Sequence, residues 1–209
     1  MRWAGIMFPA WLNAATGQCC YNWPMRVIGG RLKGHRLKSL RGLDIRPTSD
    51  LVREAIFSML ESMDIDWSYV LDLYAGTGAL GIEALSRGAE WTDFVERNPR
   101  CCALIKQNLE HTKLTEEGNV YCMSVAKALS LLDKKYGIVF LDPPYSDPAT
   151  TTILGELASS GLVGENSTMI LEHSRRVSPE ESYGSFCQTK SLCHGDTRIS
   201  VYKYTGGAS

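Results

Sequence analysis

One stretch, VLDLYAGTGALGIEAL at residues 70–85, limits the possible folds of this chain more than any other. The apolar run over 69–74 predicts a buried strand, and 79–87 is predicted to be a helix. Three glycines join the two in a G-x-G-x-x-G pattern, Gly76, Gly78 and Gly81. A strand that turns through glycines directly into a helix begins a βαβ unit, so this stretch predicts an α/β fold.

The same alternation continues through the chain. Further strands are predicted at 90–96, 119–123, 137–141 and 167–172, further helices at 99–111, 126–132 and 148–160, and a closing antiparallel pair at 184–191 and 197–204. This order predicts a Rossmann-like, doubly wound, mostly parallel sheet of seven strands with helices on both faces. Ligands of such sheets bind at the carboxyl ends of the strands, which here are 74–78, Glu96, Ser124 and 142–145.

Composition divides the chain into three parts. Residues 1–24 carry one charge and are interpreted as an extension without chemistry, 25–62 combine a basic segment with one helix, and 63–209 hold the alternating elements. No run of 18 apolar residues occurs, so no membrane span is expected. The seven cysteines include no C-x-x-C spacing, and we interpret them as reduced thiols of a cytoplasmic protein without a metal site.

The basic segment stands out against a nearly neutral chain. Residues 25–46 hold seven basic residues and one acid, a charge of +6 in a protein of net charge −1. Gly29, Gly30 and Gly34 break this segment into short pieces, which predicts a β-hairpin. A solvated hairpin without a partner is one interpretation, and contact with the phosphates of a nucleic acid is the other. A helix over 50–62 follows, introduced by capping residues.

The glycine pattern and the acids around it indicate a cofactor. Glu96 lies 20 residues after Gly76, at the end of the next strand, where a carboxylate can bind ribose hydroxyls. Asp72 precedes the glycines, and a carboxylate there opposes a pyrophosphate but suits a cation. S-adenosylmethionine carries a sulfonium and an ammonium group. The sequence therefore favours S-adenosylmethionine over NAD.

The fourth predicted strand ends on Asp-Pro-Pro-Tyr at 142–145. Asp142 can accept one hydrogen of a nucleobase amine, and the Pro143 carbonyl, held by rigid prolines, can accept the other. The ring of Tyr145 can stack on the base. These groups position a planar amine for in-line displacement, and no metal ion or covalent intermediate is needed. A paired base must first leave its helix.

These motifs resemble those of methyltransferases that act on exocyclic amines. The segments MRVIGGRLKG, IRPTSDLVREAIFSML and GDTRISVYKY are moreover similar to the RsmD family, from Met25 to about Tyr204. The resemblance implies transfer of a methyl group from S-adenosylmethionine to N2 of a guanine in 16S rRNA. It implies as partner the small ribosomal subunit or a late assembly intermediate, and we expect a monomer.

Roles for individual residues follow from the motifs and from this resemblance. The residues expected to be catalytic are Asp142, Pro143, Pro144 and Tyr145. The residues expected to bind the cofactor are Asp72, Tyr74, Ala75, Gly76, Thr77, Gly78, Leu80, Glu96, Arg97, Ser124 and Val125. The residues expected to contact RNA are Arg26, Arg31, Lys33, Arg36, Lys38, Arg46, Thr48 and Arg53.

The chain departs from the family pattern at Ser124, where an acid usually receives the adenine amino group. A serine hydroxyl can accept the same hydrogen bond, with the Val125 amide serving ring N1. Glu172 and His173 end the fifth predicted strand on the same rim, and we favour a structural role for this pair because methyl transfer needs no histidine.

Two other functions stay open. A DNA adenine-N6 methyltransferase shares the chemistry, but many of these enzymes carry Asn before Pro-Pro-Tyr and need a larger recognition region. A non-catalytic RNA-binding assembly factor with a methyltransferase fold is the second, and the intact Asp72, Glu96 and Asp142 argue against it.

Overall fold

The computed structural model describes residues 25–39, 49–144 and 149–206. The predictions for the extension over 1–24 and for Arg46, Thr48 and Tyr145 therefore lie outside the described residues.

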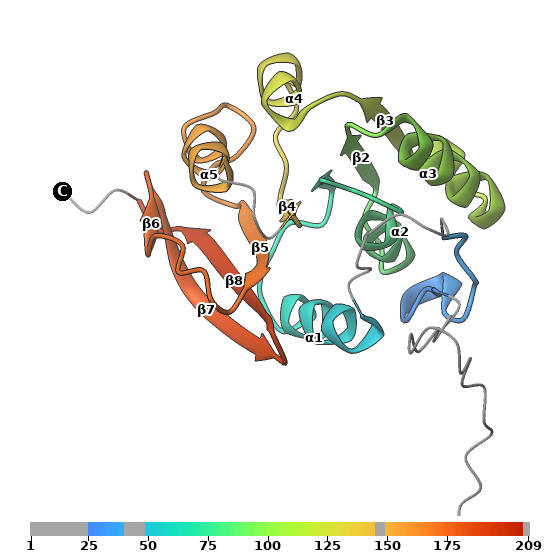
Figure 1. Ribbon diagram of the computed structural model, residues 1–209, viewed down its shortest axis with the longest axis horizontal. Helices are drawn as coiled ribbons and strands as arrows, with labels where there is room; N and C mark the ends of the chain where they lie inside the picture. Colours follow the sequence, from blue (N-terminus) through green and yellow to red (C-terminus); the bar gives the residue numbers. More distant parts are fainter. Residues whose placement is uncertain (1–24, 40–48, 145–148, 207–209) are drawn as a thin grey trace, which may run out of the picture.

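A single sheet of eight strands forms the centre of the molecule, in the order β3-β2-β1-β4-β5-β8-β7-β6 (Figure 1). The parallel strands are β1 (Tyr69–Leu73), β2 (Trp91–Glu96), β3 (Gly118–Cys122), β4 (Ile138–Leu141) and β5 (Thr168–Ser174). The antiparallel strands are β6 (Ser182–Tyr183), β7 (Phe186–His194) and β8 (Thr197–Tyr204). The prediction of a mostly parallel α/β sheet is confirmed.

The predicted number of seven strands is wrong by one. The additional strand, β6, has only two residues and pairs with Phe186 and Cys187 of β7. Gly184, at a φ of +56°, makes the tight turn between β6 and β7. Two residues are too few to produce a recognisable alternation of apolar and polar side chains, so the sequence gives no sign of this strand.

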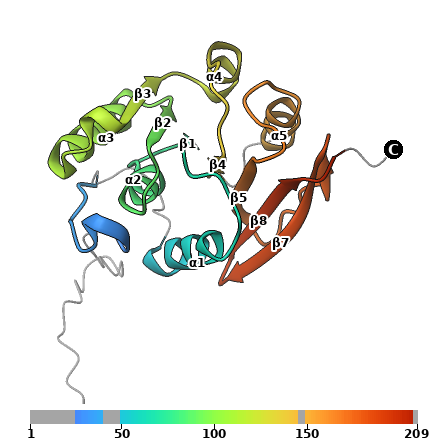
Figure 2. The same ribbon diagram turned by 180° about the vertical axis from the view of Figure 1, so that it is seen from behind.

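Helices cover both faces of the sheet (Figures 1 and 2). The helices are α1 (Asp50–Glu61), α2 (Ala79–Ser86), α3 (Pro99–Thr112), α4 (Val125–Leu131) and α5 (Thr150–Ala158), with short 3-10 helices η1 (Gly30–Leu32) and η2 (Thr115–Glu117). Side chains of α1, α2 and α3 pack in one apolar core and those of α4 and α5 in another. Among the described residues, no helix is long and apolar enough to cross a membrane.

Alternation along each strand assigns side chains to these two cores. In β1, Val70 packs in the core beneath α1, α2 and α3, whereas Leu71 and Leu73 pack in the core beneath α4 and α5. In β4, Phe140 likewise faces the first core, and Val139 and Leu141 the second. The same alternation continues at the ends of the strands. It therefore determines on which side of the sheet each side chain there lies.

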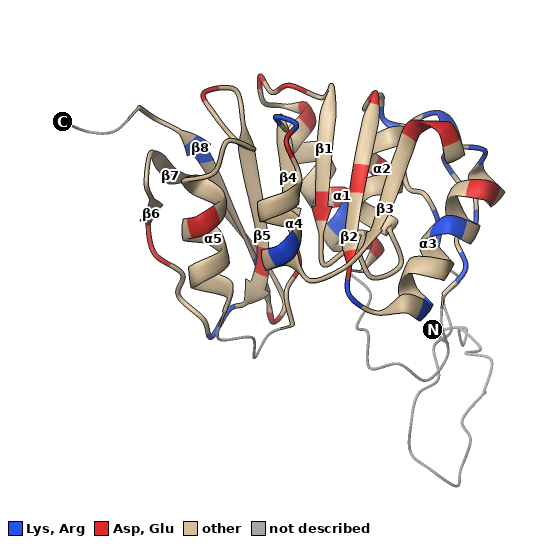
Figure 3. Cartoon of the chain, turned by 90° about the horizontal axis from the view of Figure 1, so that it is seen from above, with Lys and Arg blue, Asp and Glu red and all other residues tan. Residues whose placement is uncertain are grey.

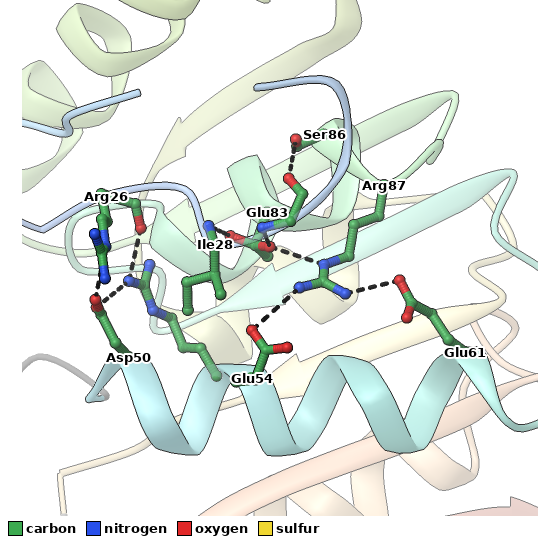
Figure 4. A network of polar contacts seen from close by, with 10 residues as sticks. Arg26, Ile28, Asp50, Glu54, Glu61, Glu83, Ser86 and Arg87 are labelled. Atoms are coloured by element: carbon green, nitrogen blue, oxygen red, sulfur yellow. Dashed lines mark hydrogen bonds and ion pairs between the residues drawn. The ribbon is translucent and has the colours of Figure 1, made fainter. Parts of the chain in front are cut away.

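The amino-terminal segment, residues 25–39, forms a short version of the predicted β-hairpin. One isolated bridge pairs Arg26 with Arg36, and η1 lies between them. Three backbone hydrogen bonds join its two arms: Val27 donates to His35 at 2.9 Å, Gly34 to Val27 at 2.8 Å and Leu37 to Met25 at 2.7 Å. The Ile28 and Gly29 amides donate to the Glu83 carboxylate of α2 at 2.7 Å each, so α2 satisfies the donors that follow the paired residues (Figure 4).

Close approach to α2 explains a glycine of this segment. Gly30 has a φ of +68°, and a Cβ atom there would lie 1.9 Å from the carbonyl oxygen of Ser86. The Ser86 hydroxyl donates to the Gly29 carbonyl at 2.6 Å and accepts from the Leu32 amide at 2.9 Å. The sequence GG at 29–30 therefore allows the backbone to lie directly on α2.

Candidate active site

A cavity of about 660 Å³ opens at the carboxyl ends of the parallel strands. It brings together most of the residues that the sequence predicted for the site. Those that line it are Asp72, Tyr74, Ala75, Gly76, Thr77, Leu80, Glu96, Arg97, Ser124, Val125, Asp142, Pro143 and Pro144. The residues predicted for the cofactor and those predicted for the acceptor base therefore share one cavity.

Gly78 was predicted to bind the cofactor but, unlike Gly76 and Thr77, does not line the cavity. It adopts a φ of +76° as the N-cap of α2, and its amide donates to the Ala75 carbonyl at 2.7 Å. Gly81 allows close packing, because a Cβ atom there would lie 2.3 Å from the ring of Phe94. These two glycines shape the turn and seat α2 on β2, while Gly76 lines the cavity itself.

Asp72 is a buried carboxyl group at the base of the cavity. Its Oδ2 accepts a hydrogen bond from the Gly81 amide at 2.9 Å. Burial raises the pKa of Asp72 to about 7, the hydrogen bond from Gly81 opposes this rise, and the charge of Glu96 adds to it. A cation bound in the cavity would favour the ionised form, so this carboxyl suits a positively charged ligand.

Glu96 is held in place by two backbone amides. Its Oε2 accepts from Gly76 at 3.0 Å and its Oε1 from Asn98 at 2.7 Å. Each carboxylate oxygen has two lone pairs, so both can still accept a hydroxyl hydrogen. The geometry fits a carboxylate that is positioned in advance for a pair of ribose hydroxyls.

Ser124 caps the amino terminus of α4, where its hydroxyl accepts from the Lys127 amide at 3.4 Å. This role gives a local reason for a serine at the position, because serine is a favoured N-cap residue. Ser124 and Val125 both line the cavity. The predicted contacts with the adenine remain a prediction.

Asp142 follows the last residue of β4, and its amide lies 3.5 Å from the Leu73 carbonyl oxygen of β1. Pro143 is buried and Pro144 is exposed, and both line the cavity beside Asp142. The two prolines fix the direction of the chain as it leaves the sheet. The predicted contacts of Asp142 and Pro143 with a base remain a prediction.

The basic side chains predicted to contact RNA have different surroundings. Those of Arg31 and Lys38 contact Glu117 and Gln107, whereas Lys33 and Arg36 are exposed. Figure 3 shows Lys and Arg gathered along the amino-terminal segment beside α2 and α3.

Arg53, which was expected to contact RNA, is fully buried. Its Nη2 donates to the Arg26 carbonyl and to Asp50 Oδ1, at 2.8 Å each, while its Nε and Nη1 have no hydrogen-bond partner. The Arg26 side chain also contacts Asp50, at 3.3 Å. Arg53 therefore ties the amino-terminal segment to α1 rather than lying on the surface.

Sequence reasoning missed Met25 and Cys101 among the residues that line the cavity, and it placed Glu172 on this rim without giving it a functional role. We had assigned Glu172 a structural role together with His173, but the two side chains separate. The His173 Nε2 lies 2.9 Å from the Ser200 hydroxyl, and burial lowers the pKa of this imidazole. Side chains alternate along β5, so Glu172 and His173 leave the strand on opposite faces, which is a signal that could have separated their roles.

Within the described ranges, no group of three or more His, Cys, Asp or Glu side chains could hold a metal ion. The five cysteines described there are free thiols.

Comparisons with known proteins agree with this architecture. A family described as "Conserved hypothetical protein 95" matches residues 25–203. The chain is 37% identical over 185 residues to "Putative rRNA methyltransferase YlbH" of Bacillus subtilis, which covers 87% of this chain and 100% of that protein. It is 32% identical over 151 residues to "Ribosomal RNA small subunit methyltransferase D" of Escherichia coli, covering 71% of this chain and 74% of that protein.

Solved structures show the same fold. A conserved hypothetical protein of Streptococcus pyogenes has a TM-score of 0.67 and 31% identity, over 72% of this chain and 94% of that one. A methyltransferase-like protein of Escherichia coli has a TM-score of 0.77 and 24% identity, over 88% of this chain and 99% of that one, which supports the fold alone.

Proposed function

Because the chain belongs to the RsmD-like family described as "Conserved hypothetical protein 95", we propose that it is a methyltransferase for rRNA. It uses S-adenosylmethionine and methylates N2 of a guanine in 16S rRNA. The observation that carries the proposal is the shared cavity. One wall holds the glycine loop with Asp72 and Glu96, and another holds Asp142, Pro143 and Pro144.

The cofactor wall fits S-adenosylmethionine. When bound, this cofactor supplies an activated methyl group on a positively charged sulfur. Glu96 would bind the ribose hydroxyls, with its carboxylate already oriented by the amides of Gly76 and Asn98. Asp72 is a buried carboxyl whose ionisation a nearby cation would favour.

The acceptor wall orients the amine. Asp142 accepts one hydrogen of the guanine N2, and the Pro143 carbonyl accepts the other, which turns the nitrogen lone pair toward the methyl group. The bound cofactor would supply the methyl group that N2 receives, and Asp142 is placed to accept the proton that N2 loses. The residues contribute by holding the two reactants in line.

The charge of the cavity also selects what enters it. Asp72, Glu96, Asp142 and Glu172 all line it, and this concentration of carboxylates repels phosphate groups. The base therefore enters while its phosphates stay outside, which is the geometry of a flipped nucleotide. Outside, the basic amino-terminal segment is placed to contact the backbone of the RNA.

We propose as partner the small ribosomal subunit or a late assembly intermediate, and we expect the protein to be a cytoplasmic monomer. The names of two relatives support rRNA as the substrate class.

The test is tritium transfer from labelled S-adenosylmethionine to small subunits purified from a strain that lacks this gene, followed by nucleoside analysis. Label in N2-methylguanosine is the expected result. Label in another nucleoside would keep the enzyme class and overturn the target. Label only in DNA would indicate an adenine-N6 methyltransferase. No label in subunits, naked rRNA or DNA would favour a non-catalytic assembly factor.

A further inference from the structure

Glu172 is an acidic residue of the cavity to which the mechanism above gives no task. It lies in β5, next to the acceptor wall, and is almost fully buried. Burying a carboxylate costs free energy, so a buried carboxylate that lines a ligand cavity is a candidate for ligand recognition.

Strand alternation shows which way Glu172 faces. In β5, Met169 and Leu171 pack in the core beneath α4 and α5, and Ile170 packs in the opposite core. Glu172 is two residues after Ile170 and therefore shares its side of the sheet. Asp142 stands in the same relation to Phe140, which is also in the core beneath α1, α2 and α3.

Register shows how close the two carboxylates lie. The last pair between β4 and β5 is Leu141 with Leu171, so Asp142 and Glu172 are the next residues on adjacent strands. Neighbouring strands are about 4.8 Å apart, and side chains on the same side of such a pair are within reach of one ligand. The acceptor wall thus presents two neighbouring carboxylates.

Guanine has donors that match two carboxylates. Its pairing edge presents the two hydrogens of the N2 amine and, beside them, the hydrogen on N1. In the proposed function Asp142 and the Pro143 carbonyl take the N2 hydrogens, which leaves N1–H without an acceptor. We propose, on the basis of that function, that Glu172 accepts the N1–H of the target guanine and so selects guanine.

This contact would reject other purines. Adenine and 2-aminopurine carry a lone pair at N1 instead of a hydrogen, and a carboxylate facing that lone pair gains no hydrogen bond and is repelled. A site built to bond a substrate hydrogen discriminates strongly against an analogue without it, because the analogue displaces water from the carboxylate without replacing the lost hydrogen bond. Glu172 therefore determines which base is positioned, whereas Asp142 acts at the reacting nitrogen.

The experiment compares guanine with 2-aminopurine, which keeps the 2-amino group and lacks N1–H. Once wild-type protein has revealed the methylated nucleotide, small subunits are reconstituted with guanosine or 2-aminopurine riboside at that position. Single-turnover methyl transfer is measured for wild type, Glu172→Gln and Glu172→Ala. Glu165→Gln is the matched control, since Glu165 is exposed in the loop before β5. Calorimetry with S-adenosylhomocysteine reports cofactor binding and folding for each variant.

Wild type and Glu165→Gln should prefer guanine by about 10- to 100-fold. Glu172→Gln should lose most of this preference, because its amide oxygen accepts from guanine N1–H and its amide hydrogens donate to N1 of 2-aminopurine. Glu172→Ala should slow transfer to guanine and show almost no preference. S-adenosylhomocysteine affinity should be unchanged throughout.

Two results would overturn this inference while leaving the proposed function intact. One is an active wild type whose preference is retained by both Glu172 variants. The other is an unchanged preference with weakened S-adenosylhomocysteine binding, which would place Glu172 in the cofactor site. A wild type that labels no guanine in any subunit would instead refute the proposed function itself.

Discussion

At the scale of single residues, substituting Asp142 should change the rate of methyl transfer without changing the affinity for the cofactor. We expect Asp142→Ala to lower the single-turnover rate of methyl transfer by about 10²- to 10⁴-fold, because the amine loses the group that orients it and takes its proton. Affinity for S-adenosylhomocysteine, measured by calorimetry, should stay at the wild-type value. Asp133→Ala, an exposed acid before β4, is the control. Equal loss of affinity and rate would assign Asp142 to the cofactor.

Asp72 gives cofactor binding a pH dependence. With a pKa of about 7 in the free protein, its carboxyl group is mostly protonated at pH 6 and mostly ionised at pH 8. A cationic ligand prefers the ionised form, so binding below pH 7 must first remove the proton, and affinity rises with pH. Calorimetry with S-adenosylmethionine should show an increase of about tenfold from pH 6 to pH 8. Asp72→Asn should bind weakly, with this increase absent.

At the scale of elements, Glu83 joins the amino-terminal segment to the rest of the molecule. Besides the amides of Ile28 and Gly29, its carboxylate accepts from Arg87 Nε at 2.8 Å (Figure 4). Removing Glu83 takes away the buried acceptor of these amides and of Arg87, whose remaining acidic neighbours, Glu61 at 2.7 Å and Glu54 at 3.8 Å, are half exposed. We expect Glu83→Ala to lower the free energy of unfolding in urea by about 3–5 kcal/mol.

Glu54→Ala is the matched control for this network. Glu54 lies 3.8 Å from the same Arg87 but is about half exposed, so its loss should cost about 0–1 kcal/mol. Equal effects of the two substitutions would show that the buried position of Glu83 does not matter.

The amino-terminal segment should contribute salt-dependent binding to RNA. Lys33 and Arg36 are exposed, so their charges are available to phosphates. Replacing both by Gln should weaken binding to 16S rRNA and reduce the slope of log affinity against log salt by about 0.7–0.9 for each lost contact. Lys135→Gln, before β4 and away from the rim, is the control. An unchanged slope would exclude this segment as the RNA contact.

At the scale of the whole molecule, some carboxylate side chains line the ligand cavity and others lie in the interior with partners from the protein alone. Asp93 of β2 is fully buried, on the opposite side of the sheet from Glu96, and accepts from Trp91, Lys134 and Tyr136. All of its bonds are internal, so its role is stability.

Tyr136→Phe tests this division between rim and core. The hydroxyl of Tyr136 donates to Asp93 Oδ2 at 2.7 Å, and its loss should lower the free energy of unfolding by about 1.5–3 kcal/mol. Methyl transfer should be unchanged, because Tyr136 precedes β4 at the edge of the sheet opposite the cavity. Tyr69→Phe, with a partly exposed ring, should have almost no effect on stability.

The sequence by itself determined the features that depend on neighbours along the chain. The alternation of strands and helices, the glycine turn, and the positions of Asp72, Glu96 and Asp142 at strand ends were all predicted from local patterns. Because parallel strands bring their carboxyl ends to one edge, these local patterns were enough to predict one shared rim.

Only the tertiary structure decided which partners distant residues meet. The Glu83 carboxylate accepts from the Ile28 and Gly29 amides, and Arg53, which was expected to contact RNA, is fully buried. Glu172 stands beside Asp142 because β5 pairs with β4 in one register, which nothing near residue 172 in the chain specifies. The physical reason is that burial and hydrogen bonding depend on which surfaces pack together, whereas local patterns specify only the direction in which each side chain leaves its own strand or helix.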